Sequence, residues 1–127
     1  MTETRKGMLI VLSGPSGTGK GTLCEKLMRD DPSLVFSVSV TTRAPRETEI
    51  EGVHYFFIDD REYDALLAAD AFLEHATVHG HRYGTLKTQV ETLIEQGKNV
   101  VLDIGPQGAR AVMSRKPDCV SVFILPP

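Results

Sequence analysis

The sequence predicts an α/β domain built around a parallel β-sheet, with a smaller mixed α/β region inserted into it. Residues 8–12, 99–104 and 120–125 are apolar runs of the kind found in strands that are buried on both faces of a parallel sheet. Segments with helical periodicity separate such runs, as in crossover connections between parallel strands. A polar stretch interrupts this alternation in the middle of the chain, which indicates an insertion.

In the first part of the chain, the first apolar run stops at a glycine-rich turn. Residues 22–29 are expected to form a helix because Leu23, Leu27 and Met28 recur at helical spacing. Residues 35–40 alternate apolar and polar side chains, which predicts a second strand.

The middle of the chain begins with a charged segment, residues 41–52, that has little apolar content and is predicted to bind a ligand rather than to pack. A short strand is expected at 55–58 and a helix at 60–69. The apolar face of this helix is expected to comprise Tyr63, Leu66 and Leu67. Residues 72–78 and 81–85 resemble the two strands of a hairpin.

The last part of the chain returns to the pattern of the parallel sheet. A helix is expected at 87–96, where apolar residues recur at helical spacing and Gly97 stands in the C-terminal cap position. A crossover helix at 107–113 is expected to join the last two apolar runs.

Composition limits the function classes. A chain of 127 residues with 41% hydrophobic content fits one globular domain. The net charge of -3 provides no global positive field for binding long nucleic acid. Cys24 and Cys119 lack the spacing of a zinc site or a disulfide framework. The N-terminus has no secretion signal and the first apolar run is too short to span a membrane, so a cytoplasmic location without membrane contact is expected.

A glycine-rich run follows the first strand directly and opens the first helix. It consists of Gly14, Pro15, Ser16, Gly17, Thr18, Gly19, Lys20, Gly21 and Thr22. Glycines allow the backbone to wrap around phosphate oxygens, and a helix N-terminus favours negative charge. Lys20 adds a positive charge for the β- and γ-phosphates. The run therefore predicts an ATP-binding phosphate loop on a P-loop NTPase-type parallel core.

The polar middle of the chain carries the motifs that indicate the second substrate. Residues 37–46 read SVSVTTRAPR and are followed by Glu49, Gly52 and Tyr55. Further matches are Phe72–Glu74, Gly80, Tyr83–Thr85, Val101–Ile104 and Gln107–Ala109. In this order and spacing the motifs resemble those of the guanylate kinase family. The resemblance implies phosphoryl transfer from ATP to GMP, giving ADP and GDP in purine nucleotide metabolism.

The resemblance assigns the GMP phosphate to a group of donors in the insertion. Arg43 and Arg46 present planar forks of N–H groups, and Tyr55 and Tyr83 present hydroxyl groups. Glu49 belongs to the same GMP-binding set by its place in the motif. Without the motif, the same residues would be interpreted as a solvated charged loop with two exposed arginines and two packing aromatic side chains.

The resemblance also assigns the guanine base. Glu74 follows apolar Leu73, and a carboxylate there can accept from N1–H and the exocyclic amine of guanine, a donor pair that adenine does not present. Ser39 and Thr85 resemble the hydroxyl contacts that the family makes to the base.

The expected cofactor is Mg²⁺, bound with ATP as co-substrate. Asp103 ends an apolar strand where carboxylates in such sheets orient magnesium or its waters. Thr22 is the second expected metal contact, because the position directly after Lys20 is Gly21 rather than a hydroxyl residue. Lys20, Arg43 and Asp103 are the residues expected to act in catalysis. A further departure is Gly105, which stands where the family has an acidic residue that contacts GMP.

The four histidines are interpreted as bystanders, because phosphoryl transfer to a phosphate acceptor needs no strong base. They are His54, His75, His79 and His81.

The family pattern continues beyond the end of this sequence into an arginine-bearing lid and closing elements. The expectation is therefore one incomplete domain, with a core at 1–34 and 86–127 and a GMP-binding insertion at about 35–85. A chain without the lid is expected to be a poor catalyst. Uncovered apolar faces predict marginal stability or self-association.

Two other functions remain open from the residues. A guanylate-kinase-like module could bind a phosphorylated peptide without catalysis. The departure at Gly105 favours this alternative, whereas the intact glycine-rich run argues against it. A related kinase could use a phosphorylated sugar, which Glu74, Ser39 and Thr85 oppose.

Overall fold

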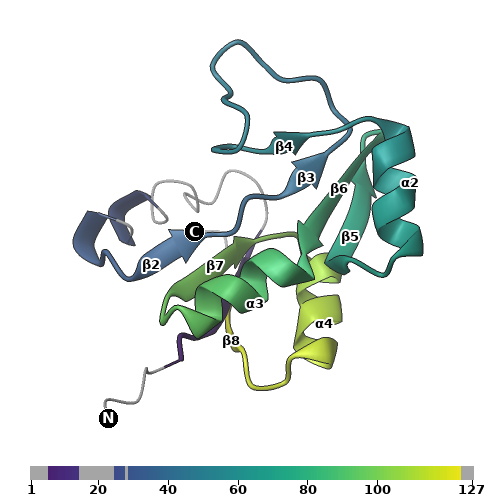
Figure 1. Cartoon of the computed structure of the whole chain (residues 1–127). Coiled ribbons are helices and arrows are strands. Elements are labelled where there is room, and N and C mark those ends of the chain that lie inside the picture. Colours follow the sequence, from purple (N-terminus) through teal and green to yellow (C-terminus); the bar gives the residue numbers. More distant parts are fainter. Residues whose placement is uncertain (1–5, 15–24, 28, 124–127) are drawn as a thin grey trace. The chain divides into compact units, whose positions relative to one another are not determined.

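The computed structural model describes residues 6–14, 25–27 and 29–123. The chain divides into two compact units (Figure 1). Unit 1 comprises Met1–Ser37 and Gln89–Pro127, and unit 2 comprises Val38–Thr88. The unit boundaries lie close to the expected bounds of the insertion.

The described residues of unit 1 form a four-stranded parallel sheet. Its strands are β1 (Leu9–Ser13), β2 (Leu34–Phe36), β7 (Asn99–Asp103) and β8 (Val120–Phe123), in the order β2-β7-β1-β8. The register of β1 against β7 places Leu12 beside Asp103. Helices α3 (Lys87–Glu95) and α4 (Pro106–Arg115) precede and follow β7 in the chain. The predicted strand–helix alternation and parallel sheet are confirmed.

The core of unit 1 is built from the apolar runs. Val11 of β1 and Val100 of β7 are fully buried. Leu12 and Val101 form a cluster against which partly buried apolar residues of β1 and β2 pack. Helix α4 contributes Val112, which is also fully buried. Continuous apolar runs were therefore a reliable sign of the central strands, because both faces of a central strand are covered.

The single strand expected at 35–40 was wrong. The chain pairs with β7 only through Leu34–Phe36, and pairs again at β3 (Val40–Thr41) in the sheet of unit 2. Alternation shows that successive side chains point to opposite faces, but it does not show that both halves of a segment belong to one sheet.

Unit 2 contains a four-stranded mixed sheet and one helix. Its strands are β3, β4 (Phe56–Phe57), β5 (Phe72–Val78) and β6 (His81–Leu86), in the order β4-β3-β6-β5, and the helix is α2 (Asp60–Ala68). The predicted hairpin of β5 and β6 is confirmed. It turns at His79 and Gly80, which both have positive φ, at 52° and 80°. Glycine adopts this conformation without steric cost.

Helix α2 packs on the sheet of unit 2 through Tyr63. This side chain is buried with Val40 and Phe72, and its ring centroid lies 4.8 Å from that of Phe72. Its hydroxyl donates to the carbonyl oxygen of Tyr83 at 2.8 Å. The predicted apolar face was wrong for Leu67, which is 40% exposed. The helix begins after Asp59, whose side chain accepts from the backbone N–H of Glu62.

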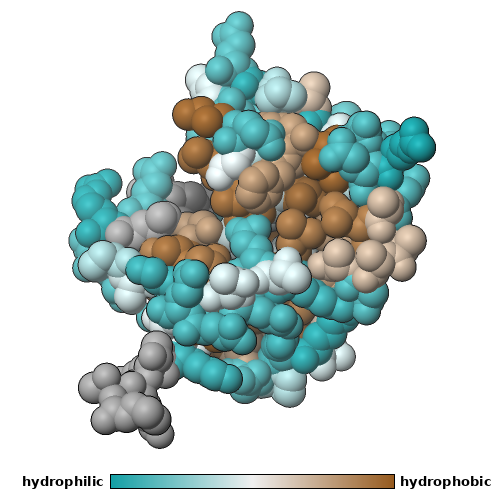
Figure 2. All heavy atoms as spheres, in the orientation of Figure 1, coloured by the Kyte–Doolittle hydropathy of each residue, from teal (hydrophilic) through white to brown (hydrophobic). Residues whose placement is uncertain are grey.

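The surface differs between the two units. On the face drawn in Figure 2, the surface of α3 is mainly hydrophilic, whereas hydrophobic side chains gather over the sheet of unit 2. In unit 1, β8 is an edge among the described strands and exposes Val120, Val122 and Phe123. In the described part of the chain, no helix combines the length and the apolar character needed to cross a membrane.

We predict that Gly84→Ala lowers the free energy of unfolding by about 1–3 kcal/mol, because an added methyl group overpacks the site. A Cβ atom at Gly84 would lie 2.5 Å from ring atoms of Phe72. Urea unfolding followed by circular dichroism measures the change. The matched control is the same substitution in a Phe72→Leu background, where the smaller side chain reduces the loss. Equal losses in both backgrounds would contradict the steric account.

Candidate functional site

The predicted ATP-binding residues lie mostly outside the described residues. Of the glycine-rich run only Gly14 is described, and it is buried directly after β1. The other predicted members fall outside: Pro15, Ser16, Gly17, Thr18, Gly19, Lys20, Gly21 and Thr22. Asp103 is exposed at the end of β7, in register with Leu12 of β1. Asp103 therefore lies at the carboxyl edge of the parallel sheet, where Gly14 follows β1.

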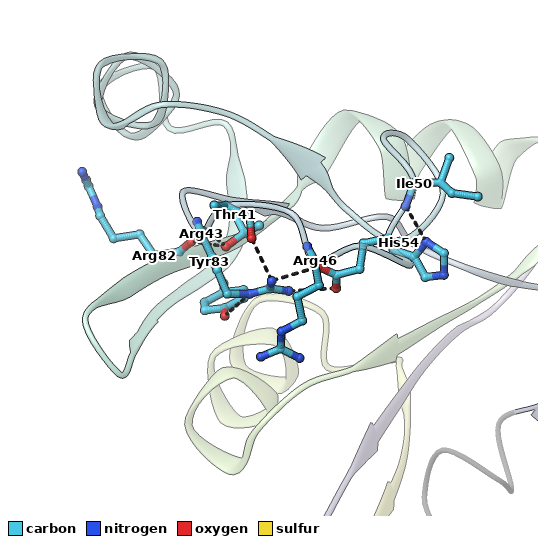
Figure 3. A network of polar contacts seen from close by, with 9 residues as sticks. Thr41, Arg43, Arg46, Ile50, His54, Arg82 and Tyr83 are labelled. Carbon is cyan, nitrogen blue, oxygen red and sulfur yellow. Dashed lines mark hydrogen bonds and ion pairs between the residues drawn. The ribbon is translucent and has the colours of Figure 1, made fainter.

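Unit 2 holds a polar network around Arg43, shown in Figure 3. Glu49 accepts from both terminal nitrogens of Arg43, at 2.8 Å from Nη1 and 2.9 Å from Nη2. Arg43 Nη1 also donates to the carbonyl oxygen of Ala44 at 3.0 Å, and Nε donates to the hydroxyl of Tyr83 at 3.3 Å. The arginine is therefore fixed by contacts to three different groups.

The Arg43–Glu49 pair is shielded from water, with 12% and 13% of the two side chains exposed. Hydrogen bonds from Arg43 and from the backbone N–H of Arg46 lower the pKa of Glu49 to about 2. The hydrogen bond to Glu49 is also the main cause that raises the pKa of Arg43. Both groups therefore carry full charge near neutral pH.

Two tyrosines complete the cluster. The ring of Tyr55 lies edge-on to that of Tyr83, with centroids 5.9 Å apart. The Cζ atom of Arg43 lies 5.3 Å from the centroid of the Tyr55 ring, within the range of a cation–π contact. The structure thus brings together four of the residues predicted to bind GMP. Three lie in the segment between β3 and β4, and Tyr83 lies on β6.

Arg46 differs from Arg43. Its backbone N–H donates to Glu49 Oε1 at 2.9 Å, and its carbonyl oxygen accepts from the backbone N–H of Glu49 at 3.0 Å. The residue is exposed, and its guanidinium group extends away from the ion pair in Figure 3. Its backbone therefore shapes the turn, while its side chain faces solvent.

Glu74 and Thr85 form a buried polar pair on β5 and β6. The two residues are partners across the antiparallel ladder, and the hydroxyl of Thr85 donates to Glu74 Oε1 at 2.8 Å. Thr85 is fully buried and Glu74 is 8% exposed. Burial raises the pKa of Glu74, against the opposing effects of the Thr85 hydrogen bond and of His75. A buried carboxylate with unused acceptor capacity can bind a ligand that presents N–H donors. Ser39, the other predicted base contact, is partly buried just before β3.

Two structural contacts near the site were not predicted from the sequence. Thr41 is fully buried, and its hydroxyl donates to the carbonyl oxygen of Arg82 and accepts from the backbone N–H of Arg43. His54, which was interpreted as a bystander to the chemistry, has a structural contact: its Nδ1 accepts from the backbone N–H of Ile50 at 2.9 Å in the turn before Tyr55. The available signal for Thr41 was a β-branched hydroxyl residue two positions before Arg43, which was predicted to bind the GMP phosphate.

Comparisons with known proteins identify the family. The family model described as guanylate kinase matches residues 6–127. The guanylate kinases of Carboxydothermus hydrogenoformans and Symbiobacterium thermophilum are both 50% identical to the chain, over 96% and 100% of its length. The chain belongs to the guanylate kinase family. It spans about 60% of the length of these curated relatives.

A crystal structure of a guanylate kinase supports the same relation. The enzyme from Anaplasma phagocytophilum is 38% identical and has a TM-score of 0.80, with 97% of this chain and 62% of that chain covered. The predicted guanylate kinase fold, a parallel core with a mixed sheet, is therefore confirmed. The roles of individual residues stay predictions.

The departure at Gly105 from the guanylate kinase pattern leaves the backbone ordinary. Gly105 caps helix α4 with φ at -70°, a value open to any residue. A Cβ atom there would meet nothing within 4 Å. The glycine therefore removes a side chain without being required by the local fold.

We predict that Glu74→Gln stabilises the chain at pH 7 relative to the wild type. Burial raises the pKa of Glu74 in the folded state. Its contribution to stability is therefore fully present below the unfolded-state pKa of about 4.3, where the carboxyl group is protonated in both states. This contribution is lost as the pH rises through the folded-state pKa. Unfolding free energies of both proteins at pH 4 and pH 7 measure the effect. The advantage of the variant should shrink at pH 4, and a difference that is independent of pH would exclude this linkage.

For Glu49 the sign is opposite. Its folded-state pKa is about 2, so the ion pair's contribution to stability is present above about pH 4.3 and is lost as the pH falls through about 2. Carbon-13 NMR titration of the side-chain carboxyl should show this low pKa. In Arg43→Gln the pKa should return toward the ordinary value, and an unchanged titration in that variant would disprove the assigned cause.

Proposed function

We propose that this chain binds GMP in unit 2 and takes part in phosphoryl transfer from ATP to GMP, giving ADP and GDP. The observation that supports the acceptor most directly is the buried Glu74–Thr85 pair. Membership of the guanylate kinase family supports the reaction. The expected cytoplasmic location stays a prediction.

Base selection follows from the chemistry of a buried carboxylate. Glu74 accepts one hydrogen bond from Thr85 and can accept more from N1–H and the exocyclic amine of guanine. Adenine presents an acceptor at N1, which would face the carboxylate without a proton between them. Because unpaired buried polar groups are costly, the site should reject AMP strongly.

The phosphate of GMP is assigned to the cluster around Arg43. Tyr83 accepts from Arg43 Nε, and its own O–H can still donate to a phosphate oxygen. Arg46 has an exposed side chain that can turn toward the same oxygen atoms. These groups hold the acceptor phosphate in one orientation, which is the main contribution that a protein makes to this reaction.

The donor side is assigned to the glycine-rich run with Lys20, and to Asp103. Asp103 fits a magnesium contact because it is an exposed carboxylate at the carboxyl edge of the sheet, and Mg²⁺ needs only one or two carboxylates beside phosphate oxygens and water. The described residues contain no cluster of three or more His, Cys, Asp or Glu side chains that could hold a metal ion by themselves. Bound Mg²⁺ would neutralise charge on the phosphates. Thr22 remains the second proposed contact.

The transfer itself needs no covalent intermediate with the protein. An oxygen of the GMP phosphate attacks the γ-phosphorus of ATP in line, and the bond to the bridging oxygen of ADP breaks. Lys20 and Arg43 are proposed to stabilise the charge on the phosphoryl oxygens. A buried carboxylate beside a hydroxyl matches the adjacent N–H donors of guanine better than the hydroxyl groups of a sugar, so Glu74 favours the nucleotide acceptor.

Calorimetric titration of GMP and AMP into the chain tests this proposal. We predict that the wild type binds GMP selectively and that Glu74→Gln weakens GMP binding by at least about tenfold, because the amide N–H₂ would face the donors of guanine. Glu62→Gln removes the same charge from an exposed position on α2 and should leave GMP binding unchanged. If wild-type chain binds neither nucleotide, the proposed acceptor site is disproved for this chain.

A further inference from the structure

The contacts of Arg43 limit how it can bind a phosphate. An arginine side chain has five N–H donors. Nη1 uses both of its hydrogens, on Glu49 Oε1 and the carbonyl oxygen of Ala44, and Nη2 uses one on Glu49 Oε2. Nε uses its hydrogen on Tyr83 at 3.3 Å, the longest of these bonds. Counting only contacts within the described part of the chain, one donor remains, on Nη2.

The remaining donor has a defined direction. The bidentate contact to Glu49 occupies the end of the guanidinium group, between Nη1 and Nη2. The other hydrogen of Nη2 therefore points along the edge that Nη2 shares with Nε. The Tyr83 hydroxyl lies on that same edge, because it accepts from Nε.

We propose that Glu49 is a positioning residue, which holds Arg43 so that the acceptor phosphate binds on the Nε–Nη2 edge beside the Tyr83 hydroxyl. This inference rests on the proposed function and deepens it. Glu49 does not itself contact the phosphate, which would be repelled by its carboxylate.

The carboxylate of Glu49 is itself fixed, as a positioning residue must be. Its Oε1 accepts from the backbone N–H of Arg46, and its own backbone N–H donates to the Arg46 carbonyl oxygen. At the other end of the pair, the backbone N–H of Arg43 donates to the buried hydroxyl of Thr41. The pair is thus anchored to the turn on one side and to β3 on the other.

A different role for Glu49 predicts an effect of opposite sign. If the carboxylate occupied the place of the phosphate, it would compete with GMP, and removing its charge would tighten binding. If it positions Arg43, removing its charge frees the guanidinium group to rotate and weakens binding. The sign of the change on Glu49→Gln therefore separates the two roles.

The test is calorimetric titration of GMP and of guanosine, which lacks the phosphate, into the wild type, Glu49→Gln and Glu47→Gln. We expect Glu49→Gln to weaken GMP binding about tenfold and to leave guanosine binding unchanged. Glu47 is exposed on the same loop, so Glu47→Gln removes an equal charge and should leave both unchanged. GMP binding that is unchanged or tighter in Glu49→Gln would overturn the inference, as would an equal loss for guanosine.

A second measurement decides the inference without GMP. In nitrogen-15 NMR spectra, the Nε–H signal of Arg43 should be protected from exchange with water in the wild type and should lose this protection in Glu49→Gln. Equal protection in both proteins would show that Glu49 does not hold the guanidinium group. If the wild type does not bind GMP but its Arg43 Nε–H signal is protected, the result would count against the proposed function. The fixed position of Arg43 would still be established.

Discussion

The pairing of β3 with β6 is the constraint on which the rest of unit 2 depends. β3 has only two residues, and it places Thr41 opposite Tyr83. Its loop begins directly afterwards, so Arg43 lies within reach of the Tyr83 hydroxyl. On its other side, β6 pairs with β5 in an antiparallel ladder, which places Glu74 opposite Thr85. Two short ladders thus gather the base-binding and phosphate-binding groups proposed for GMP.

The pairing of β3 and β6 is stabilised by buried polar groups as well as by apolar burial. Thr41 and Thr85 are fully buried, and each hydroxyl makes a hydrogen bond. Unpaired, each would cost about 1–3 kcal/mol, so these bonds make the local register strongly preferred. Tyr63 adds to this, because its hydroxyl bonds the carbonyl oxygen of Tyr83 while its ring packs in the core. The same contacts that stabilise unit 2 therefore fix the positions of the proposed site residues.

The sequence was sufficient for features that depend on local pattern. Continuous apolar runs predicted β1, β7 and β8, although β8 is exposed rather than buried on both faces. Gly97 predicted the end of α3, where its φ is 83°. It was not sufficient where a segment changes its partner, as between β2 and β3, because alternation is the same in either sheet. The spacing of residues in the sequence also did not predict the bidentate ion pair of Arg43 with Glu49. The motif named both residues as GMP ligands, whereas the structure shows that their side chains bind each other.

Two carboxylates of unit 2 have pKa values shifted in opposite directions by their surroundings. Glu74 is desolvated and accepts from the Thr85 hydroxyl, so its charge is costly and part of its acceptor capacity is unused within the described residues. Glu49 is held by a guanidinium group and a backbone N–H, so its charge is secured and its acceptor capacity is used within the protein. Opposite pKa shifts of this kind can suit two chemically similar carboxylates to different roles. The carboxylate with unused acceptor capacity is suited to the proposed recognition of the base, and the satisfied one is suited to hold the arginine that is proposed to bind the phosphate.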